Sequence, residues 1–188
     1  MKSRERTKAA VTLSAALVIG LVAGGATFSA FNAQTTSTGN SFGAGTVSLT
    51  DNDSGSAMFT VPGMRPGAPV SRCLQVTYTG SLPAGVKLFG ATTGGTGLEA
   101  YLNLTVTRGT IASPAFPDCT GFTADSGGGV LYSGTLASYP STYAAAITDP
   151  AAAWATNEKH VYQFTVDVAD NQAAEGRTAT QTFTWDAR

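Results

Sequence analysis

The chain of 188 residues carries 11 Lys and Arg against 12 Asp and Glu, with one histidine and two cysteines. This near balance of charge offers no basic surface for nucleic acid. A single histidine is also too few for the usual catalytic zinc sets, which use two or three.

The N-terminus predicts a secretory signal peptide over residues 1–30. Four basic residues and one acidic residue lie between positions 2 and 8, and no charge follows until Asp51. A basic region before an apolar run is the layout of a signal peptide. Three glycines weaken a membrane-spanning helix here, and no Lys or Arg follows the run to stop transfer. An uncleaved membrane anchor is the alternative.

Two cleavage positions fit this segment in different ways. A cut after Ala26 places small residues, Gly24 and Ala26, at the third and first positions before it. A cut after Ala30 places Phe28 where a small residue is usual. The general rule therefore favours Ala26 without excluding Ala30.

Removal of residues 1–30 leaves one domain of ordinary size, residues 31–188. It keeps seven Lys and Arg against eleven Asp and Glu, because four basic residues and one acidic residue are removed. Such a surface attracts neither nucleic acid nor an anionic membrane. We expect membrane contact only through an uncleaved N-terminal segment.

Apolar residues at every second position predict about eight short strands. Clear candidates are residues 46–49, 74–80, 101–109, 161–168 and 178–188, where Phe183 and Trp185 face inward; weaker ones are 57–61, 85–90 and 129–134. Turn-forming residues separate them at 51–55, 62–69, 92–97 and 126–129. In the alanine-rich connection 138–154, Pro140 and Pro150 limit helix to one or two turns. The pattern predicts an all-β antiparallel sandwich of immunoglobulin-like or jelly-roll type, and we adopt the jelly roll.

The two cysteines, Cys73 and Cys119, both follow the signal peptide. An even pair in an exported chain predicts a disulfide. Cys73 is expected at the start of a strand and Cys119 in a proline-containing loop, so the bond would restrain a long connection outside the central packing.

Motifs for catalysis or metal binding are weak. His160 stands next to a predicted strand and belongs to no HExxH motif, so we interpret it as a surface histidine. Asp51 and Asp53 have the spacing of the first two ligands of a calcium loop. Position twelve of that loop is Pro62, where the motif needs a bidentate glutamate. A hairpin turn is the better interpretation, and we expect no metal or other cofactor.

Two stretches resemble the TasA/camelysin family of secreted bacterial matrix and surface proteins. "ATFSAFNAQTTSTGNSFGAGTVSL", residues 26–49, has an apolar run, a Phe-Asn pair, a polar linker and an aromatic-x-x-Gly-Thr-x-x-Leu strand entry. "MRPGAPVSRCLQVTYTGSL", residues 64–82, has the family's turn before a strand and its Gly-Ser-Leu turn after it. The last strands fit more loosely.

The resemblance implies cleavage between Ala30 and Phe31 by a dedicated signal peptidase, in place of the cut after Ala26. It implies a secreted, non-enzymatic subunit of extracellular or cell-surface fibres in a biofilm matrix. Residues 31–42, "FNAQTTSTGNSF", would be a flexible segment that adds as a donor strand to the next copy. Phe31, Asn32 and Phe42 are its candidate assembly residues, and the partner is the chain itself, joined head to tail.

Two other functions stay open at this point. Some members of the family are described as surface metalloproteases, which makes a camelysin-like protease the first alternative. The second is a monomeric surface sandwich that binds a polysaccharide or another protein. Its candidate contacts are Tyr139, Tyr143 and Trp154 in the long connection, although these aromatic residues would equally serve to cap the core.

Overall fold

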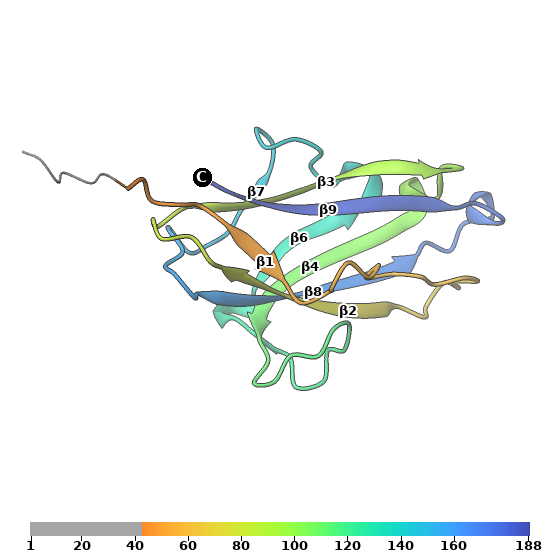
Figure 1. The fold of residues 1–188 in the computed structure, drawn as a ribbon. Helices are drawn as coiled ribbons and strands as arrows, with labels where there is room; N and C mark the ends of the chain where they lie inside the picture. Colours follow the sequence, from red (N-terminus) through yellow and green to blue (C-terminus); the bar gives the residue numbers. More distant parts are fainter. Residues whose placement is uncertain (1–42) are drawn as a thin grey trace, which may run out of the picture. The chain divides into compact units, whose positions relative to one another are not determined.

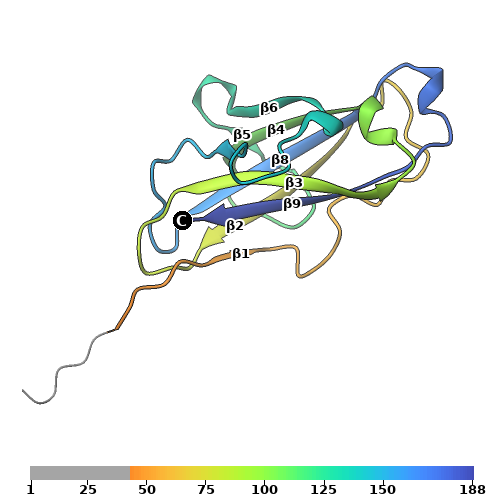
Figure 2. The same ribbon diagram turned by 90° about the horizontal axis from the view of Figure 1, so that it is seen from above.

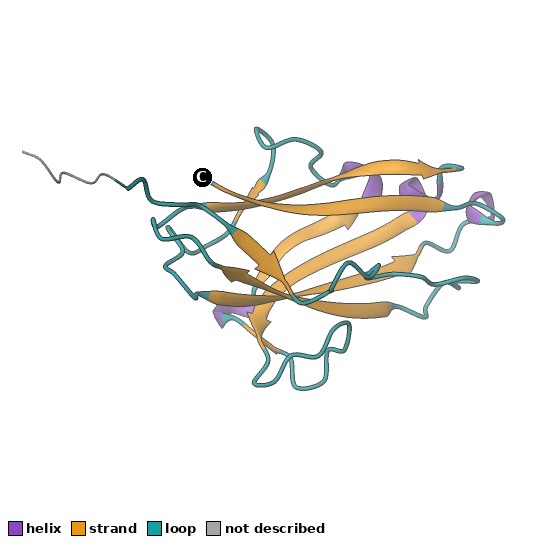
Figure 3. Ribbon diagram, in the orientation of Figure 1, coloured by secondary structure: helices purple, strands orange, loops and turns teal. Residues whose placement is uncertain are grey.

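The computed structural model describes residues 43–188. The predicted signal peptide, the Ala30–Phe31 cut and the assembly residues Phe31, Asn32 and Phe42 lie outside the described residues. Strands dominate the described part, with 3-10 turns between them (Figure 3). No helix within residues 43–188 has the length and apolar character needed to cross a membrane.

The larger sheet is antiparallel and contains six of the described strands. Its order is β1 (Leu49–Asp51), β2 (Val70–Tyr78), β8 (Lys159–Val168) and β4 (Leu102–Thr110), and both β5 (Thr123–Ala124) and β6 (Val130–Thr135) pair with β4. The strands β2, β8 and β4 form its centre because each is long and alternates buried with less buried residues.

The smaller sheet has three strands in the order β7 (Ile147–Thr148), β3 (Val86–Gly95) and β9 (Ala179–Ala187). Figures 1 and 2 show β3 and β9 as a second layer across the larger sheet. The two layers confirm the predicted all-β antiparallel sandwich. Because the smaller sheet has fewer strands, it covers the larger one unevenly.

The core lies between the two sheets, where the inward residues of the alternating strands meet. Phe164 of β8 packs its ring 4.6 Å from that of Phe183 and 5.9 Å from that of Trp185. These contacts confirm that Phe183 and Trp185 face inward. The most completely buried large side chains are Trp154, Tyr78, Tyr162, Phe164, Leu88 and Leu104.

A buried carboxylate ties the long connection to the larger sheet. Asp149 follows β7, and its side chain is fully buried. Its Oδ1 accepts hydrogen bonds from Arg108 Nη1 at 2.6 Å, from the Ala151 N–H at 2.9 Å and from Trp154 Nε1 at 3.2 Å. Its Oδ2 accepts the hydroxyl of Tyr162 at 2.7 Å. Burial and this carboxylate raise the pKa of Tyr162. The pairing satisfies a charge whose burial would otherwise be costly.

Several expectations of local structure were wrong. Residues 57–61 form no strand, since their backbone makes no hydrogen bond to another described residue. The glycines predicted to make a turn at 92–97 continue β3 as far as Gly95, whose φ of 120° suits glycine. The connection 138–154 contains a turn at residues 143–145 and the unexpected two-residue strand β7.

Candidate functional site

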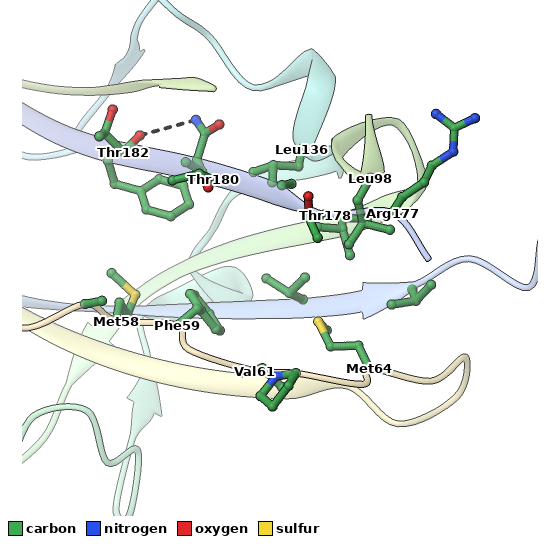
Figure 4. A pocket seen from close by; sticks show the side chains of 18 of the residues that line it. Met58, Phe59, Val61, Met64, Leu98, Leu136, Arg177, Thr178, Thr180 and Thr182 are labelled. Atoms are coloured by element: carbon green, nitrogen blue, oxygen red, sulfur yellow. Dashed lines mark hydrogen bonds between the residues drawn. The ribbon is translucent and has the colours of Figure 1, made fainter. Parts of the chain in front are cut away.

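An apolar groove of about 1500 Å³ opens between β9 and residues 56–66, here called the strap. The strap joins β1 to β2 and crosses the opening of the sandwich without pairing as a strand. Figure 4 shows Met58, Phe59, Val61 and Met64 on the strap side and the β9 strand opposite them.

Apolar side chains line most of the groove. Met58, Phe59 and Met64 are half-buried and pack against the core. Two 3-10 turns contribute Leu98 and Leu136, and the larger sheet contributes Leu49, Leu74, Val76, Leu102, Val166 and Val168. An occupant of this groove would therefore gain mainly from burial of apolar surface.

The opposite wall of the groove is the outer edge of β9. Among the described strands β9 pairs only with β3. Arg188 and Gly85 exchange both backbone hydrogen bonds, at 2.9 and 3.0 Å. Bonded and non-bonded positions alternate along an antiparallel pair. In the register of β3 and β9, the backbone N–H and C=O groups of Gln181, Phe183 and Trp185 therefore point away from β3, toward the groove.

This arrangement is suited to an extended peptide. The nine residues of β9 offer an edge roughly 30 Å long. A strand added there would gain main-chain hydrogen bonds from β9 and would place alternate side chains against the apolar lining. Threonines at 178, 180 and 182 also line the groove.

The predicted disulfide between Cys73 and Cys119 is present, with 5.1 Å between the two Cα atoms. Cys119 lies in the loop between β4 and β5, as expected. Cys73 is the fourth residue of β2 rather than the start of a strand, because pairing with β8 begins at Val70. Its side chain is buried but lies outside the core cluster, so the bond ties the 111–122 loop to the large sheet.

The candidate metal ligands serve structural roles. His160 is half-buried rather than a plain surface residue: its Nε2 lies 2.9 Å from Glu158 Oε1, and its ring packs 4.5 Å from that of Trp154. Asp51 Oδ1 accepts the N–H of Asp53, and Asp53 Oδ1 accepts the N–H of Gly55, which makes the expected turn. Burial raises the pKa of Asp51. Within residues 43–188 no three His, Cys, Asp or Glu side chains come together as a metal site.

The aromatic residues of the long connection do not form an exposed binding face. Trp154 is 0% exposed and Tyr139 is 5% exposed, since both belong to the core. Burial raises the pKa of the Tyr139 hydroxyl. Tyr143 is the remaining candidate, and its ring contacts the Arg188 guanidinium at 3.9 Å and the Lys87 ammonium at 4.7 Å.

Comparison with models of protein families gives a match for the N-terminal half of the chain. The model of the family described as "Camelysin metallo-endopeptidase" matches residues 4–93, a stretch that includes β1, the strap, β2 and most of β3. A search of curated proteins finds no match. The family match covers 90 of the 188 residues and is consistent with the resemblance of residues 26–49 and 64–82 to the TasA/camelysin family.

Proposed function

We propose that this protein is a secreted, non-enzymatic structural subunit that assembles into fibres of a biofilm matrix or cell surface. Residues 31–42 of one copy, freed by a signal peptidase at Ala30, would enter the groove of the next copy as an added strand. The observation that carries the proposal is the outer edge of β9, which no strand within residues 43–188 covers, beside an apolar groove.

The dimensions support this occupant. An extended segment of twelve residues spans roughly 40 Å, enough to follow the whole β9 edge. Apolar anchors such as Phe31 would bury surface against the groove lining. Because the donor segment and the groove are different surfaces, the contact cannot close on itself, and it propagates head to tail as a filament.

A metalloprotease is the alternative that the family's description raises, and the residues present do not fit a zinc site. The chain has one histidine, and His160 is held by Glu158 and Trp154. Both cysteines are in the disulfide. Residues 1–42 add only Glu5 as a further candidate ligand. We therefore derive no reaction step through a metal.

The main test compares two lengths of the chain. Protein beginning at Phe31 is expected to form filaments whose amount rises with concentration, and protein lacking residues 31–40 is expected to stay monomeric. Electron microscopy and light scattering provide the measurements. If both proteins remain monomeric under all concentrations, donor-strand assembly is wrong.

A pair of substitutions in β9 tests the acceptor edge itself. Gln181→Pro removes an N–H that points toward the groove, so it should block assembly while the sandwich still folds, because proline is tolerated on an edge strand. Gln181→Ala keeps that N–H and should assemble normally. Thr182→Pro, in contrast, removes an N–H that faces β3 and should destabilise the sandwich itself. Normal filaments from folded Gln181→Pro protein would show that β9 is not the acceptor.

A further inference from the structure

The two methionines of the described chain lie on the same wall of the groove. Met58 and Met64 both belong to the strap, and their side chains line the opening opposite β9 (Figure 4). Each is half-buried, so solvent reaches it in the single chain. The sequence contains only one other methionine, Met1. Both cysteines are in the disulfide, so the thioethers of Met58 and Met64 are the oxidisable sulfur atoms within residues 31–188.

We propose that Met58 and Met64 are oxidation sites through which a peroxide controls occupancy of the groove. This inference rests on the proposed function, since it concerns regulation of the same groove. In the reaction the thioether sulfur attacks one peroxide oxygen, the O–O bond breaks and an S–O bond forms. The sulfur loses two electrons, and the second oxygen leaves as water. Methionine sulfoxide is the product, and methionine sulfoxide reductases reverse it.

The consequence follows from the position of the sulfur atoms. A thioether is apolar and adapts to a neighbouring side chain, whereas a sulfoxide is polar and accepts hydrogen bonds. Met58 and Met64 lie on the same wall as Phe59, and both pack against the core. Covering a sulfoxide there with an apolar anchor of the donor segment, such as Phe31, leaves its oxygen without a partner, which is unfavourable.

Oxidation should therefore hinder assembly, and assembly should slow oxidation. Oxidised single chains should assemble poorly, and chains already in filaments should be oxidised slowly, because the occupant covers the two sulfur atoms. The cost of leaving one sulfoxide oxygen without a hydrogen bond should raise the protein concentration needed for assembly roughly tenfold or more.

The experiment uses protein beginning at Phe31 treated with hydrogen peroxide before assembly. Peptide mapping by mass spectrometry locates the added oxygen at Met58 and Met64, and circular dichroism checks that the sandwich is retained. The control is the double variant Met58→Leu/Met64→Leu, which conserves apolar volume; its assembly after peroxide is compared with its own assembly without peroxide, and the two should be equal. Treatment with methionine sulfoxide reductases should restore assembly of the oxidised protein.

The outcomes separate this inference from the proposed function. Oxidised protein that assembles at the same concentration as untreated protein would overturn the inference alone. The same holds if peroxide blocks the double leucine variant equally, or if both methionines oxidise as fast in filaments as in single chains. If untreated protein forms no filaments at all, the proposed function fails, and the inference fails with it.

Discussion

Removal of the Cys73–Cys119 disulfide should lower the melting temperature without unfolding the sandwich. The bond joins residues separated by 46 positions. In the chain-entropy model, a closed loop of this length stabilises the folded state by about 4 kcal/mol. With an unfolding entropy of about 2.1 cal/mol/K per residue, a domain of this size should lose roughly 10 to 15 °C.

The fold should persist at room temperature because the bond lies outside the core. Cys73 faces the 111–122 loop rather than the packed cluster between the sheets. Circular dichroism melts with and without reductant measure the shift, and a Cys73→Ala/Cys119→Ala variant is the control for incomplete reduction. A melting temperature unchanged by both treatments would refute the reasoning, as would two free thiols in protein exported by its native host.

Three further changes test other parts of the structure. Asp149→Ala removes the shared acceptor of a buried network and leaves Arg108 without a buried partner, so denaturant unfolding should show a loss of about 3 to 5 kcal/mol; a loss below about 1 kcal/mol would contradict this. Trp154→Ala should cost about 3 to 5 kcal/mol through the cavity it creates, so any lost glycan binding in this variant would reflect unfolding, as a melt would reveal. The hydrogen bond from the Ala155 N–H lowers the pKa of the Glu158 carboxyl in the folded state. The ionised carboxylate therefore stabilises the fold at a pH above the pKa of the unfolded chain, and this stability is lost as the pH falls through the pKa of the folded state. Glu158→Gln should remove this small, solvent-screened part of the acid dependence in melts between pH 2 and 6, by less than about 1 kcal/mol; identical pH profiles would contradict it.

The sequence predicted the central strands well because their burial alternates with period two. Residues 101–109, 161–168 and 178–188 correspond closely to β4, β8 and β9, and residues 74–80 overlap the second half of β2. The same alternation wrongly predicted a strand at residues 57–61, whose backbone forms no hydrogen bond to another described residue. Strand propensity records local preference, while pairing depends on which segments meet in space.

The groove and the Asp149 network were not predictable in the same way. The groove exists because the smaller sheet ends at β9 while the larger sheet continues through β2 to β1, an order that local patterns do not encode. In the sequence, Asp149 is one polar residue within the connection 138–154. Its partners Arg108, Trp154 and Tyr162 come from three separate segments, and only the fold brings them together.

The sequence of the strap explains why the strap does not pair with the outer edge of β9. A long edge strand exposes backbone N–H and C=O groups that can pair with another chain, and proteins usually shield such an edge. The strap carries Met58, Phe59 and Val61 over the apolar floor, but Pro62 and Pro66 lack the N–H groups that a continuous ladder requires. Side chains of the strap therefore cover the groove, and no strand within residues 43–188 other than β3 pairs with β9. In the proposed assembly, a donor segment from a second copy would supply the hydrogen bonds that the strap does not, because residues 31–42 contain no proline.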